Sequence, residues 1–194
     1  MSLLTRNDLT VSLGAGGLDA LPAMRRGARV TAVLSSHHAR YVRLPWSPHL
    51  AGDDEWLAFA RHQFAETYGA TASGWEIRVS PTPKGAARIA CALDRELLAA
   101  LRTAVARAGA KLVSVQPGLM HAFNKHRAEL GRSAGWLVAA EDGRLTLALV
   151  ARGLWELVRV RNVGNGWRDE LDGILRREEA LAHRDVPIDR VVLA

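Results

Sequence analysis

A mixed α/β fold is predicted by three features of this 194-residue sequence. Short runs of β-branched and apolar residues alternate with longer segments whose apolar residues recur at helical spacing. This succession of strands, helix and strand occurs twice along the chain, and a glycine-containing stretch at 131–135 separates the two passes. We therefore predict a first lobe over residues 1–131 and a smaller, partial second lobe over residues 132–194, both with mixed sheets.

The first pass begins with a strand, a turn and a predicted hairpin. Residues 9–13 and 29–35 are apolar and β-branched, as in buried strands, whereas residues 39–44 alternate between polar and apolar side chains. Ser36 and His37 supply a turn between the second and third of these segments. The sequence therefore predicts that the second and third strands form a hairpin after the N-terminal strand.

Helices and further strands complete the first pass. Asp53 and Asp94 precede two helical patterns and are predicted as their N-caps, because a carboxylate can accept hydrogen bonds from free backbone N–H groups. The predicted core-facing residues are Trp56, Phe59, Ala60 and Phe64 in the first helix, and Leu97, Leu101, Val105 and Ala108 in the second. Strands are predicted at 75–80, 87–93 and 111–116, and a third helix from Pro117 to about Leu130.

The second pass has a three-stranded meander, a helix and a closing strand. Strands are predicted at 136–140, 145–151 and 155–162. Asp142-Gly143 lies in the first turn and has hairpin chemistry, because glycine adopts positive φ at little cost. An amphipathic helix is predicted from Trp167 to about Leu181, and the last strand over 188–193.

Composition restricts the classes of function. The chain carries 26 Lys and Arg residues against 20 Asp and Glu residues, a net charge of +6, but its cations form no run of five or more. We therefore do not expect a nucleic-acid-binding face. Cys91 is the single cysteine, so no disulfide forms within the chain. No segment reaches the roughly 20 apolar residues of a membrane span, and the N-terminus lacks a signal-peptide pattern, so we expect a cytoplasmic protein.

Histidine and serine patterns do not support a metal site or a hydrolase. His37 and His38 are adjacent, so on a strand they would face opposite sides. His121 and His126 are not at the i,i+4 spacing that aligns two ligands on a helix. Ser36 lies beside His37, but no Gly-x-Ser-x-Gly elbow accompanies the pair. We therefore predict no catalytic residues and no metal ligands.

Three segments resemble PilM-type actin-like proteins of type IV pilus assembly and the related proteins of type II secretion platforms. Residues 112–123 are similar to a strand-then-helix passage of that family, and residues 136–150 to the opening meander of its second lobe. Residues 187–193 resemble the strand that leads into a nucleotide-contacting turn. The resemblance covers roughly residues 29–194 and implies actin-like, ribonuclease H-like lobes, the second of them truncated.

Nucleotide binding in that family depends on acidic residues and on glycine-rich turns that present backbone N–H groups to phosphate. This sequence departs from the pattern: Ser12 stands where an acid is expected, Arg144 follows the second turn, and no residues follow Ala194 to make the last turn. We therefore expect no cofactor. If a nucleotide does bind, the residues expected to hold it are Gly14, Gly16, Gly17, Asp142 and Gly143.

The resemblance and these departures together predict a non-catalytic actin-like scaffold or adaptor that binds proteins during pilus or secretion-platform assembly. The expected partner is a segment of an inner-membrane platform protein, which would hold the chain at the membrane periphery, and a homodimer is compatible with the sequence. The predicted contact residues lie on the strand at 40–44, which could accept a partner strand, and in the loop after it: Arg40, Tyr41, Arg43 and Trp46. Two alternatives stay open, an ATP-binding actin-like protein with degenerate motifs and a basic nucleic-acid-binding module.

Overall fold

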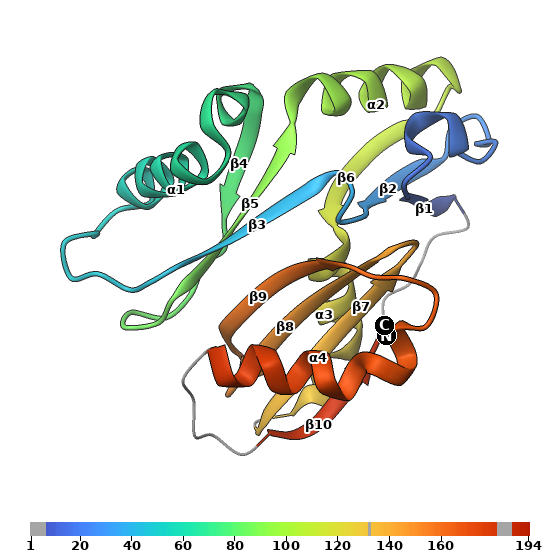
Figure 1. Cartoon of the computed structure of the whole chain (residues 1–194). Helices are drawn as coiled ribbons and strands as arrows, with labels where there is room; N and C mark the ends of the chain where they lie inside the picture. Colours follow the sequence, from blue (N-terminus) through green and yellow to red (C-terminus); the bar gives the residue numbers. More distant parts are fainter. Residues whose placement is uncertain (1–6, 132, 182–187) are drawn as a thin grey trace.

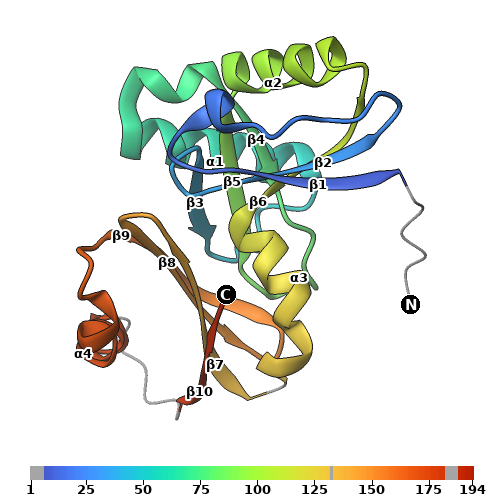
Figure 2. The same ribbon diagram turned by 90° about the vertical axis from the view of Figure 1, so that its right-hand side faces the viewer.

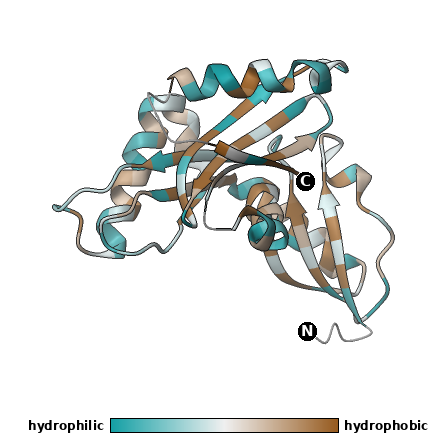
Figure 3. Cartoon of the chain, turned by 90° about the horizontal axis from the view of Figure 1, so that it is seen from below, coloured by the Kyte–Doolittle hydropathy of each residue, from teal (hydrophilic) through white to brown (hydrophobic). Residues whose placement is uncertain are grey.

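Three sheets with helices packed against them make up the molecule (Figure 1). The computed structural model describes residues 7–131, 133–181 and 188–194. Strand orders within the sheets are β1-β2-β6, β3-β5-β4 and β10-β7-β8-β9. Brown, apolar colour is concentrated on the strands, while the helices carry teal, polar stretches (Figure 3). The predicted α/β class is confirmed.

The first sheet is parallel and is made of strands far apart in the sequence. Its members are β1 (Asp8–Leu13), β2 (Arg29–Leu34) and β6 (Lys111–Pro117), with β2 in the centre. A short 3-10 helix, η1 (Gly17–Ala20), follows β1. Leu13, Val30 and Leu34 are fully buried in a core shared with helix α2 (Arg95–Arg107). As expected for a parallel sheet covered by a helix, these strands are continuous apolar runs.

The predicted hairpin of the second and third strands does not form. β3 (Ala39–Leu44) instead pairs antiparallel with β5 (Arg88–Asp94), whose other side pairs with β4 (Trp75–Val79). The physical reason is that β2 has no free edge, because β1 and β6 occupy both of its sides. The turn after Leu34 therefore directs the chain from one sheet into another.

Helix α1 (Asp53–Tyr68) covers one face of the antiparallel sheet, and the 3-10 helix η2 (Gly69–Gly74) leads from it into β4. Trp56, Ala60 and Phe64 are buried as predicted.

The predicted cap of α1 is wrong, because the helix begins after Gly52. The Glu55 carboxylate accepts hydrogen bonds from the backbone N–H groups of Ala51 at 2.6 Å and Gly52 at 3.0 Å. Asp53 forms an ion pair with Arg88 at 3.0 Å instead.

Helix α2 begins as predicted, because Asp94 Oδ1 accepts hydrogen bonds from the N–H groups of Glu96 at 2.7 Å and Leu97 at 3.1 Å. Its buried face differs from the prediction at two residues. Leu98 lies in the core in place of Leu97, which is only partly buried, and Ala108 lies just past the end of the helix and is also only partly buried. Gly109 has a φ of +70°, which is typical of a residue that ends a helix.

The second lobe is a four-stranded sheet with a helix on each face (Figure 2). Its strands are β7 (Ala134–Glu141), β8 (Arg144–Ala151), β9 (Leu154–Asn162) and β10 (Ile188–Leu193). Helix α3 (Gly118–Leu130) packs on one face and helix α4 (Trp167–Leu181) on the other. The meander, the helix and the closing strand match the prediction, and the structure adds that β10 pairs parallel with β7. By its packing α3 lies with this sheet, although the predicted boundary at 131 assigns it to the first lobe.

Among the described residues, no helix combines the length and the apolar character needed to cross a bilayer.

Candidate functional site

Two turns that are distant in the sequence are bonded to one another where the lobes meet. The Glu141 carboxylate accepts hydrogen bonds from the Ser36 backbone N–H, at 2.8 Å, and from the Ser36 hydroxyl. Arg144 Nη1 donates to the Ser36 carbonyl oxygen at 2.8 Å, and His37 Nε2 donates to the Asp142 carbonyl oxygen at 2.9 Å. We call this set of contacts the interlobe latch. It fixes the turn after β2 against the turn between β7 and β8.

The latch includes one of the two glycine-containing turns considered for nucleotide binding, Asp142-Gly143, and lies beside the other. His38 Nε2 donates to the Gly14 carbonyl oxygen at 2.7 Å, and its neighbour His37 contacts Asp142. The structure thus brings both turns to the same place. However, the bonded atom of Asp142 is its backbone carbonyl, and Gly143, with a φ of +67°, serves the hairpin.

Gly16 and Gly17 shape the other turn. Gly17 has a φ of +61°, and a Cβ on Gly16 would lie 3.2 Å from the Cβ of Ala20. These two glycines therefore have a structural role in the tight passage into the 3-10 helix η1.

The four residues predicted to contact a partner are placed differently from one another. Tyr41 packs into the core beside α3, and its hydroxyl accepts a hydrogen bond from the Leu119 N–H at 3.4 Å. Burial raises the pKa of Tyr41 well above its ordinary value. Arg43 Nε donates to the Trp155 carbonyl oxygen at 3.1 Å, so Tyr41 and Arg43 hold the lobes together. Trp46 is 42% exposed, and Arg40 lies half-buried at the edge of its sheet.

A pocket of about 480 Å³ lies between β3 and β9, at the edge of each sheet, and we call it the basic cleft. Figures 1 and 2 both show these strands as neighbours across the two lobes. Its charged lining residues are all arginines: Arg40, Arg43, Arg144 and Arg159. The sequence analysis identified the first two as contact residues, noted Arg144 only as a departure from the nucleotide-binding pattern and did not identify Arg159, because only the fold brings β8 and β9 to β3.

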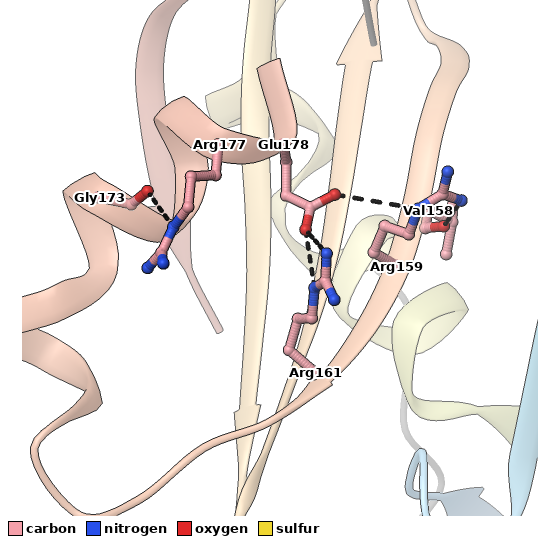
Figure 4. Close-up of polar contacts among 6 residues, drawn as sticks. All are labelled: Val158, Arg159, Arg161, Gly173, Arg177 and Glu178. Carbon is pink, nitrogen blue, oxygen red and sulfur yellow. Dashed lines mark hydrogen bonds and ion pairs between the residues drawn. The ribbon is translucent and has the colours of Figure 1, made fainter. Parts of the chain in front are cut away.

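Buried Glu178 of helix α4 fixes the outer part of β9. Its Oε1 accepts hydrogen bonds from Nε of Arg161, at 2.7 Å, and from Nη2 of the same residue. Nε of Arg159 lies 3.9 Å from the other carboxylate oxygen (Figure 4). Glu178 is 2% exposed. This acid and its two arginines therefore hold the edge strand that borders the basic cleft.

A second pocket, of about 430 Å³, lies on the face of the β4-β5 pair opposite α1, and we call it the apolar groove. Alternate residues of β5, among them Ile89 and Cys91, form part of its floor, because alternate side chains of a strand share a face. The other apolar lining residues come from β4, β5, α2, β6 and α3: Val79, Leu93, Leu98, Val115, Pro117 and Met120. Glu76, Arg78, Ser80, Arg102 and Asn124 add polar groups.

Cys91 is a structural residue in this groove. Its side chain is buried, and burial raises the pKa of the thiol to about 12. The thiolate is the nucleophilic form of cysteine, so this residue is unreactive at neutral pH. Within the described parts of the chain, no cluster of three or more His, Cys, Asp or Glu side chains could bind a metal ion.

The chain has the actin-like fold, as its similarity to solved structures shows. It resembles a structure of the PilM-PilN type IV pilus biogenesis complex, with a TM-score of 0.56 and 20% identity, over 80% of this chain and 47% of that one. It also resembles a Bacteroides thetaiotaomicron protein with an actin-like ATPase fold and unknown function. The TM-score is 0.53 at 14% sequence identity, and the match covers 86% of this chain and 59% of that one. The chain therefore spans about half the length of these two proteins.

The cytoplasmic domain of EpsL, an inner-membrane component of the type II secretion system of Vibrio cholerae, is matched more completely. Its TM-score is 0.61 at 10% identity, and the match covers 96% of this chain and 85% of that one. No family model matches this sequence, and no curated protein matches it. The resemblance to PilM-type and secretion-platform proteins expected from the sequence is thus confirmed as a likeness of fold.

Proposed function

We propose that this chain is a non-catalytic actin-like scaffold that binds a segment of an inner-membrane component during pilus or secretion-platform assembly. The apolar groove is the observation that carries the proposal. Its volume and its mainly apolar lining with a few polar groups are typical of preformed binding sites. The structures of similar fold support the setting, because one is a PilM-PilN complex and another belongs to an inner-membrane secretion component.

The groove suits a polypeptide because it borders an edge strand. β4 pairs only with β5 within the described part of the chain, so one side of its backbone is available for strand addition. Apolar side chains of an added segment would contact residues such as Val115 and Met120, while Arg102 and Asn124 could bind its polar groups. Affinity would then come from the backbone, and selectivity from the side chains.

The absence of catalysis is proposed from the latch. Arg144 occupies the position after the second turn and donates to Ser36. Ser12, where the related family has an acid, is exposed on β1. Neither residue supplies a carboxylate for Mg²⁺, the ion that accompanies nucleotide phosphates.

A matched pair of variants on β6 tests the proposal. Val115→Glu places a charge in the groove, whereas Val113→Glu places the same charge at a residue that is 39% exposed and is not part of the groove lining. Affinity capture from solubilised inner membranes should recover a pilus or secretion component with the wild type and Val113→Glu. Val115→Glu should lose it. Arg102→Glu, at an exposed position of α2, gives a second groove variant that should fold normally.

Two outcomes would contradict the proposal. In one, no pilus or secretion component is captured by the wild type. In the other, both groove variants capture the component as well as the wild type does, while thermal melting shows that each is folded.

A further inference from the structure

The basic cleft runs along two strand edges. Five consecutive residues of β3, from Ala39 to Arg43, line it, and so do three consecutive residues of β9, from Val158 to Val160. Successive side chains of a strand point to opposite faces, so a pocket that contacts consecutive residues lies along the edge of the strand. β3 and β9 are each the last strand of their sheet within the described residues. The cleft is therefore bordered by backbone groups of two edges.

The positive charge of this cleft is only partly neutralised. Arg43 is paired with Glu156 at 3.8 Å, and Arg159 lies 3.9 Å from Glu178. In contrast, no ion pair joins Arg40 or Arg144 to a carboxylate in the part of the chain that the structure describes.

These two arginines converge on a single atom. Arg40 Nη1 donates to the Ser36 carbonyl oxygen at 3.1 Å, and Arg144 Nη1 donates to the same oxygen at 2.8 Å. The nearest acid of the latch, Glu141, is instead bonded to the N–H and hydroxyl of Ser36. Two like charges held this close repel one another, and an anion placed between them would relieve the repulsion.

We propose that the basic cleft binds an extended acidic polypeptide segment, which pairs with the β3 edge at the Arg40 end of the cleft, beyond the contact of Arg43 with Trp155 of β9, and places a carboxylate between Arg40 and Arg144. Guanidinium groups bind carboxylates through two parallel hydrogen bonds, so these arginines select acidic side chains. The strand edge selects extended backbone. This site is separate from the apolar groove, and the proposal does not depend on the function proposed for that groove.

The observations favour a polypeptide over a nucleic acid. Sequence-tolerant binding of single strands uses aromatic side chains on which successive bases stack. The aromatic lining residues of the cleft are Tyr41 and Tyr68, and Tyr41 is packed against the core beside α3. Two bordering strand edges match a peptide backbone, whereas a nucleic acid would leave their N–H and C=O groups without partners of the same geometry.

The experiment uses the full chain and a peptide of alternating Glu and Val, with the corresponding Lys-Val peptide as its charge control. We expect saturable binding of the Glu-Val peptide that weakens as salt is raised, and no binding of the Lys-Val peptide. Arg40→Gln and Arg144→Gln should each raise the dissociation constant about tenfold. Arg107→Gln, which removes the same charge from an exposed position of α2, should leave it unchanged.

Strand addition has its own measurement. In a second Glu-Val peptide, alternate backbone nitrogens are methylated, so that one edge of the extended peptide has no N–H donors. This peptide keeps its charges but cannot pair with β3, so its binding should be at least tenfold weaker. Hydrogen exchange in the complex should slow at β3 amides. The proposal is overturned if Arg40→Gln and Arg144→Gln bind the peptide like the wild type, or if the methylated peptide binds equally well. It is also overturned if inorganic phosphate or a single-stranded oligonucleotide binds these two arginines and the peptide does not.

Discussion

Glu141 accepts a hydrogen bond from the Ser36 backbone N–H at 2.8 Å, across 105 residues of sequence. This contact joins two lobes whose sheets share no strand. Glu141→Ala removes the acceptor and leaves the part-buried Ser36 N–H unpaired, so we expect unfolding to require about 2 kcal/mol less free energy. Chemical denaturation measures this loss.

Its neighbour provides the control for the latch. Asp142 contributes its backbone carbonyl oxygen to His37, so Asp142→Ala keeps that contact and should change stability by less than about 0.5 kcal/mol. Equal losses for Glu141→Ala and Asp142→Ala would contradict the role given to the Glu141 carboxylate.

Glu178 should be important for the stability of the second lobe. It is 2% exposed and bonded to Arg161, so Glu178→Ala removes a buried acceptor and opens space beneath α4. We expect a loss of about 3 kcal/mol, measured by urea denaturation. Glu170→Ala, at an exposed position on the same helix, should cost under about 0.5 kcal/mol. If the two variants are equally stable, Glu178 does not anchor β9.

We expect the buried thiol of Cys91 to make the folded chain less stable in alkaline solution. The pKa of its thiol is about 12 in the folded chain, against about 8.5 when unfolded. The free energy of unfolding is therefore unaffected by this group below about pH 8.5, and falls above it by about 1.4 kcal/mol per pH unit. The decline continues until the folded thiol ionises.

Cys91→Ala should reduce this alkaline slope, as urea denaturation at about pH 8 and about pH 10 would show. The pKa of Tyr41 is also raised by burial, so a smaller decline should remain in the variant at higher pH. Identical slopes for the variant and the wild type would show that the Cys91 thiol does not remain protonated in the folded chain.

Mg²⁺-ATP should not stabilise this protein. A ligand that binds the folded state raises the melting temperature, but the Asp142-Gly143 turn is bonded to His37 and is followed by Arg144. We expect no shift in a melting experiment with and without Mg²⁺-ATP. A saturable shift that Asp142→Ala abolishes would favour the alternative of an ATP-binding actin-like protein.

The regular elements were predictable because their patterns are local. The meander of β7, β8 and β9 has alternating or continuous apolar runs separated by short turns, and each of its strands was placed to within about two residues. The cap at Asp94 depends on residues two and three positions further along the chain, so the sequence alone identifies it.

Pairing between distant segments was not predictable in the same way. The turn at Ser36 and His37 looks like a hairpin turn, but the partner of β3 is decided by which edges are free after β1 and β6 have joined β2. The basic cleft has the same origin. Arg40 and Arg144 meet only because two turns from different lobes are bonded together.

The position of β6 has a consequence for the order of folding. β2 and β6 are paired, yet β3, α1, β4, β5 and α2 all lie between them in the chain. This intervening unit has a core of its own around Trp56 and Phe64, and can collapse through contacts nearer in sequence. Contacts between distant residues form slowly. The amides of β6 should therefore gain protection after those of β5, and β1 and β2 remain an incomplete sheet until the rest of the lobe has folded.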